Sequence, residues 1–182
     1  MTDTQQSDYS LLDLDIKISM YTSMVLIRQA EEAISDLVES KEIKTPCHLY
    51  IGQEAIAVGV CAALNVEDYI WGGHRSHGHY LAKGGNLDQM MAEIFGRETG
   101  CAGGRGGSMH LCAPEVGVLG TVPLVAATIP LAVGSGMASK LRPKVTISLG
   151  IDFPFFVRLT SRSTSEIFPS SSLINRAAPS LS

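Results

Sequence analysis

The first third of the chain has apolar residues at the spacing of an α-helix. From Leu11 to about Ile43 an apolar side chain recurs every three or four residues, which predicts a long amphipathic helix with a wide buried face. Arg28 falls among these apolar neighbours, so we expect it to be partly buried and paired with a carboxylate. The residues expected on the buried face are Leu12, Ile16, Met20, Met24, Ile27, Ala30, Ile34, Leu37 and Val38. The acidic residues expected on the solvated face are Glu31, Glu32, Asp36 and Glu39.

Shorter helices and extended segments alternate after the break at Thr45-Pro46. The helices predicted from apolar spacing cover residues 52–64, with Asn65 as C-cap, residues 87–96 and residues 129–138. The extended segments predicted are residues 68–71 and the apolar strand 145–149. A helix, a turn, an apolar strand and then a glycine is typical of an α/β sheet domain. In such sheets ligands bind beyond the carboxyl ends of the strands.

The helix predicted at residues 87–96 has a clear start signal. Asn86 is a suitable N-cap, and Gln89 stands three residues later in the capping-box position. Its apolar residues indicate core packing rather than a cofactor site, and they are Met90, Met91, Ile94 and Phe95.

Polar residues that carry chemistry are concentrated between Gly72 and His110. Histidines at 74, 77, 79 and 110 lie there, together with a glycine-dense loop that runs from Gly100 to His110. The loop matches neither a P-loop nor a dinucleotide fingerprint. Two interpretations stay open for it, a structural glycine turn or a backbone cradle for an anion. The segment His74-Arg75-Ser76-His77-Gly78 follows an extended segment, where functional loops are common.

Composition excludes some classes of function. The chain of 182 residues has a net charge of -4 and no basic tract, so nucleic-acid binding is not expected. It has no long apolar run and no signal-peptide core, so no membrane span is expected. Four cysteines without CxxC spacing favour free thiols in the cytoplasm, with a zinc site as a minor alternative. Residues 1–10 are polar, and we expect a disordered leader there.

Five segments in order resemble one family. They read CHLYIGQEA, HRSHG, GRETGCAGGRGGSMH, VPLVAATIPLAVG and KVTISLG. Together they resemble the alpha subunit of thiamine-diphosphate-dependent 2-oxo acid dehydrogenases, the pyruvate, branched-chain and acetoin group. The resemblance covers about Met20 to Gly150. It implies a thiamine-diphosphate-binding fold, a parallel sheet flanked by helices, which is incomplete here and occupies residues 11–150.

The resemblance also implies roles for individual residues. His48, which by itself reads as an ordinary structural histidine, matches a histidine near the reacting carbon and the substrate. His74 and Arg75 match a Tyr-Arg pair whose arginine contacts the cofactor diphosphate. Val125, with Leu124, matches backbone that holds the aminopyrimidine ring, and Pro123 stands where many members have glycine. The loop 103–110 matches a segment that orders near the site and helps to receive a lipoyl-bearing partner.

The implied reaction is oxidative decarboxylation of a 2-oxo acid with transfer of the acyl group to lipoamide. Thiamine diphosphate supplies the electron sink, and a nearby histidine moves protons. The implied partners are a beta subunit, which completes the site in a heterotetramer, and a lipoyl-bearing acyltransferase. Magnesium is implied as the ion that bridges the diphosphate to the protein.

The sequence departs from the family where the metal ligand is expected. Gly150 fits the end of the strand, but Ile151 takes the ligand position and Asp152 is displaced by one residue, which turns it to the opposite face unless the strand bulges. Residues 151–182 contain no glycine or lysine and show no helical or strand period after Phe156. We therefore expect an unrelated tail, disordered or frame-shifted, or else a short natural tail. An impaired enzyme or an inactive truncated remnant are the corresponding functional expectations.

Overall fold

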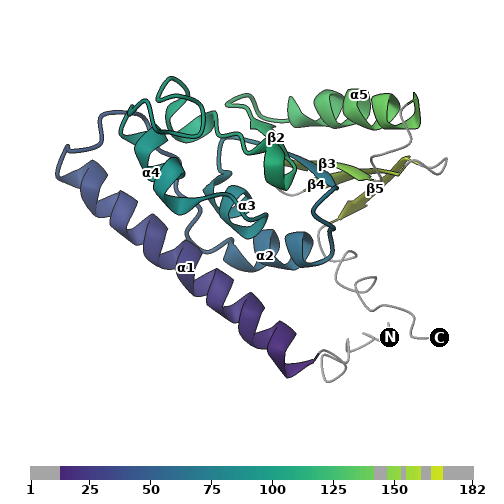
Figure 1. Cartoon of the computed structure of the whole chain (residues 1–182), viewed down its shortest axis with the longest axis horizontal. Helices are drawn as coiled ribbons and strands as arrows, with labels where there is room; N and C mark the ends of the chain where they lie inside the picture. Colours follow the sequence, from purple (N-terminus) through teal and green to yellow (C-terminus); the bar gives the residue numbers. More distant parts are fainter. Residues whose placement is uncertain (1–12, 142–146, 153–154, 161–164, 170–182) are drawn as a thin grey trace, which may run out of the picture.

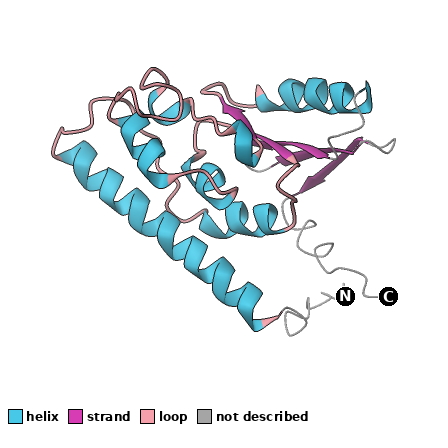
Figure 2. Ribbon diagram, viewed as in Figure 1, coloured by secondary structure: helices cyan, strands magenta, loops and turns pink. Residues whose placement is uncertain are grey.

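The structure is a computed structural model that describes residues 13–141, 147–152, 155–160 and 165–169, with side chains as far as residue 139. A sheet of short strands lies among the helices (Figure 2). The α-helices are α1 (Leu14–Glu39), α2 (Glu54–Ala62), α3 (His77–Ala82), α4 (Leu87–Ile94) and α5 (Thr128–Leu141), with 3-10 turns η2 (Gly107–Met109) and η3 (Pro114–Val116). The strands are β1 (Tyr69–Gly72), β2 (Val118–Thr121), β3 (Ile147–Asp152), β4 (Phe155–Thr160) and β5 (Ser165–Pro169).

The strands form one sheet in the order β2-β1-β3-β4-β5. Strands β2, β1 and β3 are parallel, which confirms the α/β class and a partial thiamine-diphosphate-binding type of sheet. Strands β4 and β5 add to it in antiparallel direction, so the sheet is mixed and not wholly parallel as predicted. The physical reason is connection length, because only two residues of sequence separate β3 from β4 and parallel pairing needs a longer crossover.

The segment after Phe156 also differs from the prediction. Where no strand was expected, Phe155–Thr160 pairs with β3 and Ser165–Pro169 pairs with β4. An edge strand presents unpaired N–H and C=O groups, and these template pairing even where the side chains lack a clear two-residue period. The frame-shifted origin of residues 151–182 stays a prediction, and the expected leader 1–10 lies outside the described residues.

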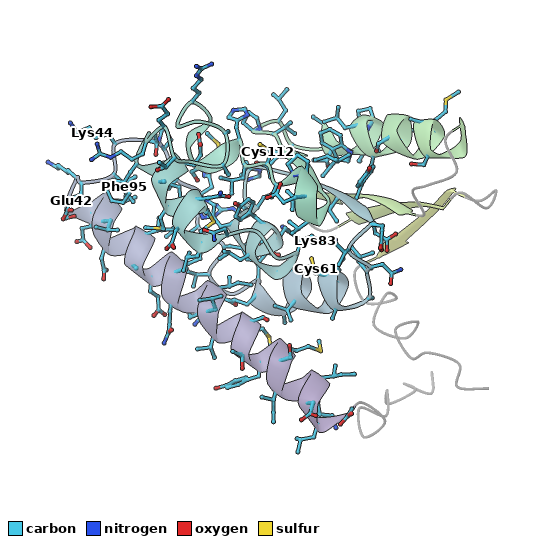
Figure 3. All side chains as sticks on the ribbon, in the orientation of Figure 1. Glu42, Lys44, Cys61, Lys83, Phe95 and Cys112 are labelled. Atoms are coloured by element: carbon cyan, nitrogen blue, oxygen red, sulfur yellow. The ribbon has the colours of Figure 1, made fainter. Side chains whose placement is uncertain are left out.

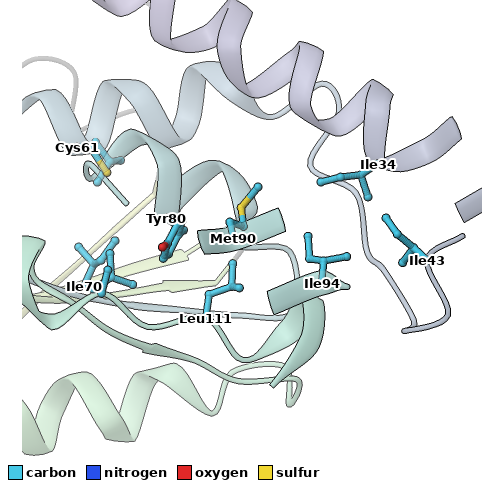
Figure 4. Close-up of a cluster of buried hydrophobic side chains, with 11 residues drawn as sticks. Ile34, Ile43, Cys61, Ile70, Tyr80, Met90, Ile94 and Leu111 are labelled. Carbon is cyan, nitrogen blue, oxygen red and sulfur yellow. The ribbon is translucent and has the colours of Figure 1, made fainter. Parts of the chain in front are cut away.

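Helices cover the two faces of the sheet unequally. Helix α5 lies along one face, while α2 and α3 lie on the other, with α1 and α4 beyond them (Figure 1). The main core fills this thicker side. In Figure 4, Ile94 of α4 lies between Ile34 of α1 and Leu111. Buried residues of the cluster are Ile34, Ile43, Val60, Cys61, Ile70, Tyr80, Met90, Ile94, Leu111, Ala113 and Val118.

Helix α1 confirms the longest predicted element and corrects both of its faces, since Ile16 and Val38, predicted on the buried face, are exposed. Arg28 is partly buried, and its Nε donates to Glu54 Oε1 at 2.7 Å, as expected for a cation among apolar neighbours. Glu31, predicted on the solvated face, is fully buried. It follows Ile27 by four residues and precedes Ile34 by three, so helical geometry puts it on the buried stripe with them.

The helix of residues 87–96 follows its sequence signals closely. Helix α4 starts at Leu87, and the Asn86 side chain accepts a hydrogen bond from the Gln89 N–H at 3.0 Å. Met90 and Ile94 are buried, and Met91 and Phe95 pack against the cluster. The Asn65 C-cap was wrong for α2. The helix is capped at Ala63, and Asn65 N–H donates to Asp68 Oδ2 at 2.8 Å instead.

Two further elements were missed. Helix α3 begins at His77, in a segment predicted as a loop because it follows an extended segment. Gly78 is there for packing, because a Cβ on it would collide with the Tyr50 ring. Strand β2 has only four residues, and its pairing with β1 defines it. In the described part of the chain, no helix is long and apolar enough to span a membrane.

We expect acid to destabilise this fold because His79 is buried in its neutral form. Burial lowers the pKa of His79 to about 4, from an ordinary value of 6.5. Below pH 6.5 the unfolded chain therefore binds a proton that the folded chain does not, and stability is lost as the pH falls towards 4. The free energy of unfolding in urea should fall by about 2 kcal/mol between roughly pH 7 and pH 5.

His79→Gln should flatten this dependence, and His110→Gln, at an exposed histidine, should leave it intact. Glu54 and Glu93 contribute little in this window, because hydrogen bonds hold the pKa of each carboxyl below its usual value. An unchanged slope in His79→Gln would show that the buried imidazole is not the cause.

Candidate functional site

The carboxyl ends of three parallel strands meet at one edge of the sheet. Gly72 at the end of β1 pairs with Thr121 of β2 on one side and with Ile151 of β3 on the other. The Val122 N–H donates to the Gly72 carbonyl at 2.9 Å, which continues the pairing beyond β2. The edge is therefore a continuous platform of backbone, and ligands of such sheets bind there.

The predicted site residues follow these strand ends. His74 and Arg75 come directly after β1, Pro123 and Val125 come after β2, and Gly150 and Asp152 lie at the end of β3. Segments far apart in sequence are thus brought to one edge by the parallel topology.

His48 joins this edge from a fourth segment. Its ring lies 5.2 Å from that of His74, edge to face at 89°. Arg75 Nη1 donates to the Leu49 carbonyl at 2.6 Å, which holds the backbone next to His48. Burial lowers the pKa of His48, and electrostatic repulsion from its neighbours, among them the Arg75 guanidinium, lowers it further. His48 is therefore a neutral imidazole at neutral pH, ready to accept a proton.

Val125 is less directly connected. It lies in the loop between β2 and α5, and its side chain is 69% exposed. The next residue, Ala126, has a φ of 65°, a left-handed conformation that costs a non-glycine residue about 1 kcal/mol. The topology brings this loop to the same edge of the sheet as Arg75.

The buried carboxyl group of Glu31 connects several segments of the site by hydrogen bonds. Glu31 Oε1 lies 2.7 Å from His77 Nδ1, and Glu31 Oε2 accepts the Tyr50 N–H at 3.0 Å. His77 Nε2 lies 2.7 Å from Ser108 Oγ in the glycine-rich loop. This Glu31–His77–Ser108 chain links α1, the segment after His48, the start of α3 and the loop.

The glycine-rich loop does cradle an anion, but the anion is Glu93 of α4. Its carboxylate accepts the N–H groups of Ala102 at 2.7 Å, Gly104 at 2.8 Å, Gly106 at 2.6 Å and Gly107 at 3.2 Å. Burial alone would raise the pKa of Glu93, but these amides outweigh it and hold the pKa below its usual value. The cradle is therefore filled by the protein's own side chain, and the structural interpretation of the loop is the one the structure supports.

Glycine is required in this cradle for two different reasons. Gly104 has a φ of 73°, where other residues are strained. A Cβ on Gly100 would collide with the Glu93 carboxylate.

The far end of the loop is fixed to β2. Thr121 Oγ1 donates to the Met109 carbonyl at 2.7 Å and accepts the Leu111 N–H at 2.8 Å. His110, between them, is exposed. The loop thus presents a histidine at the edge of the sheet from a backbone that is held on both sides.

Glu31, Glu93 and Ser108 were not predicted as site residues. Both glutamates had a sequence signal, since Glu93 follows the buried Met90 by three residues and so falls on the apolar stripe of α4. Ser108 had none, because only the fold brings it to His77.

The position expected for the metal ligand belongs to Ile151, and Asp152 follows it by one residue. Strand β3 pairs with β1 through Ile151 and with β4 through Asp152 in continuous register, so its backbone has no bulge next to Asp152. Among the described residues, no three His, Cys, Asp or Glu side chains gather as metal ligands, which also leaves the zinc alternative without a site.

The cysteines do not form a reactive centre. Cys61 and Cys112 lie well apart in Figure 3, and none of the four cysteines is in a disulfide. Burial raises the pKa of every thiol, that of Cys61 to about 12, so thiolate nucleophiles are not available at neutral pH.

The fold and this edge define an α/β protein with polar side chains at the carboxyl ends of its parallel strands. The family model described as "Dehydrogenase E1 component" matches residues 22–151. The chain therefore belongs to the dehydrogenase E1 family, which confirms the resemblance seen in its motifs.

Its relatives are alpha subunits. The alpha subunit of acetoin:2,6-dichlorophenolindophenol oxidoreductase of Bacillus subtilis is 44% identical over 130 residues, 71% of this chain. The mitochondrial pyruvate dehydrogenase E1 component subunit alpha-1 of Oryza sativa is 39% identical over 134 residues, 74% of this chain. The corresponding mitochondrial subunit alpha of Saccharomyces cerevisiae is 41% identical over 125 residues, 69% of this chain. The matched parts span 39%, 34% and 29% of these three relatives' own lengths.

We expect Glu93→Gln to open the glycine-rich loop without unfolding the core. The amide has one oxygen for four N–H donors, and leaving a buried donor unpaired costs about 1–3 kcal/mol. Limited digestion with trypsin, read by mass spectrometry, should show cleavage after the exposed Arg105 accelerated by about tenfold or more.

Glu98→Gln is the matched control, since Glu98 is exposed on the same segment. Equal cleavage rates in the two variants would mean that the carboxylate of Glu93 does not hold the loop.

Proposed function

We propose that this chain is the cofactor-binding part of an alpha subunit of a thiamine-diphosphate-dependent 2-oxo acid dehydrogenase. The observation that supports it most is the gathering of His48, His74 and Arg75 with the loop after β2 at one sheet edge. Family membership implies thiamine diphosphate as the cofactor. The sheet edge carries a guanidinium group and two imidazoles, which suit a diphosphate and proton transfer.

The residues present fit a diphosphate group. Arg75 is exposed and uses one guanidinium nitrogen for the Leu49 carbonyl, which leaves further N–H groups for phosphate oxygens. Within the described part of the chain, His74 Nδ1 is buried and has no hydrogen-bond partner. A buried nitrogen of this kind needs a partner, and a ligand oxygen at the edge would provide one.

Thiamine diphosphate, when bound, supplies the electron sink that stabilises charge as a 2-oxo acid loses carbon dioxide. This chain's own residues orient and exchange protons. Arg75 and His74 would hold the diphosphate end, and the backbone at Pro123 and Val125 would support the aminopyrimidine ring. Burial lowers the pKa of His48, so its imidazole would accept or return a proton at the substrate.

The family implies a magnesium ion, with Gly150 and Asp152 nearest to its expected position. The register of β3 is regular, and Asp152 stays one residue beyond the position expected for the metal ligand. This supports the second candidate, a chain whose cofactor binding is impaired.

The partners follow from the same proposal. A beta subunit would complete the site, a lipoyl-bearing acyltransferase would receive the acyl group, and a 2-oxo acid would be the substrate. The Bacillus relative, named for acetoin, favours acetoin as a further substrate to be compared with pyruvate. A cytoplasmic location stays a prediction, and the rice and yeast relatives are named as mitochondrial.

Calorimetric titration with thiamine diphosphate and magnesium, in the presence of a beta-type chain of the family, tests the proposal. Arg75→Ala should weaken binding by about 10- to 100-fold, the worth of a charge-assisted hydrogen bond. The matched control is Arg97→Ala, at an exposed arginine in the turn after α4, which should bind as the parent chain does.

Equal affinities for the parent chain and Arg75→Ala would contradict the assignment of the diphosphate site. Binding that is absent from all three proteins would favour the impaired chain. Carbon dioxide release from pyruvate, compared with turnover of acetoin, then separates the two substrates.

A further inference from the structure

Three segments of the proposed site are tied together below the surface by the Glu31–His77–Ser108 chain. Tyr50, whose N–H donates to Glu31, lies two residues after His48. His77 lies two residues after Arg75, and Ser108 lies two residues before His110. His48, Arg75 and His110 therefore each lie two residues from a group bonded in the same buried hydrogen-bond chain.

The links of this chain are short hydrogen bonds between buried groups. Glu31 Oε2 accepts from Tyr50 N–H at 3.0 Å, and Glu31 Oε1 lies 2.7 Å from His77 Nδ1. His77 Nε2 lies 2.7 Å from Ser108 Oγ, and the tautomer of the ring sets which of the two donates.

The order Glu, His, Ser is also that of a hydrolase triad, but burial excludes that role. Glu31 and His77 are 0% exposed and Ser108 is 1% exposed, so no substrate reaches the hydroxyl. A nucleophile needs access to a reacting atom. The Glu31–His77–Ser108 hydrogen bonds therefore have a structural role within the protein.

Burial also makes these bonds dependent on one another. If Ser108 leaves, His77 Nε2 is left unpaired in a water-free interior, and if Glu31 shifts, both His77 and the Tyr50 amide lose their acceptor. Unpaired buried groups are costly, and networks in a low dielectric strengthen one another. The bonds are therefore made and broken together more readily than one at a time.

We propose that Glu31, His77 and Ser108 are positioning residues that make the His48 segment and the glycine-rich loop order as one unit. The coupling itself rests only on the buried chain. Its consequence for a cofactor rests on the proposed function: a ligand that further stabilises the loop at His110 also holds His48 in place, and the reverse holds by linkage.

Hydrogen exchange of single amides in the full chain, followed by NMR, tests the coupling without any ligand. Ser108→Ala removes one hydroxyl that does not touch Tyr50. We expect the Tyr50 amide to exchange at least about tenfold faster in this variant, because its acceptor Glu31 is released at the other end of the chain. The amide of Ile70, which donates to Gly117 in the core at 2.8 Å, should keep its rate.

Two further variants sharpen the result. Ser139→Ala is the matched control, since Ser139 is buried and its hydroxyl bonds the Ser135 carbonyl in α5. It should leave the Tyr50 amide unchanged. Ser108→Thr keeps a hydroxyl and should restore slow exchange at Tyr50.

Glu31→Gln tests the same coupling from the opposite end if Ser108→Ala fails to fold. It should speed exchange at Gly107 and Leu111, which flank Ser108 and bond to Glu93 and Thr121 rather than to Glu31. Unchanged exchange at Tyr50 in Ser108→Ala, or at Gly107 and Leu111 in Glu31→Gln, would overturn the proposal. Equal acceleration at Ile70 and Tyr50 would also overturn it, because that pattern indicates global destabilisation.

Adding thiamine diphosphate separates this inference from the proposed function. Slower exchange at Tyr50 and Gly107 together, in the parent chain alone, supports both. Coupling in the free chain with no response to the cofactor supports the positioning role and contradicts the cofactor assignment for this chain.

Discussion

The structure depends on how it accommodates two carboxylates that have no access to water. Glu31 and Glu93 are each fully buried, and a buried charge is tolerated only when hydrogen bonds replace its hydration. Glu31 collects an imidazole and a backbone amide, and Glu93 collects four backbone amides. Both sets of donors come from segments that surround the sheet edge, so satisfying the charges also fixes the backbone there.

This arrangement changes the meaning of the glycine-rich loop. Its glycines let successive amides turn towards one anion, as in a phosphate-binding nest, but the anion belongs to α4. The loop is consequently shaped before any ligand arrives. A preorganised loop lowers the entropy lost on binding, which is what a site assembled from separate segments needs.

The sheet edge provides the second constraint. Parallel strands put all their carboxyl ends on one side, so His74, Arg75 and the loop after β2 meet without being near one another in sequence. The same constraint works against a metal site. One residue of displacement in β3 reverses the face of a side chain, and the regular pairing on both sides of β3 gives no bulge to correct it.

The sequence by itself determined the elements whose signal is local. Neighbouring residues specify the helical spacing of apolar residues along α1 and the Asn86 cap of α4. The order of helical and extended segments likewise indicated the α/β class. Five motifs in order were enough to indicate the family and its candidate residues. Glu31 and Glu93 were also within reach of helical spacing, since both fall on apolar stripes.

Tertiary structure decided which of these residues meet. Helix α3 forms where Gly78 packs on Tyr50, β2 exists because β1 is beside it, and β4 pairs with the open edge of β3. The contact of Ser108 with His77 spans 31 residues of sequence, and no local pattern specifies it. Pairing and burial depend on groups brought from elsewhere in the chain, so their energies appear only once the whole chain has folded.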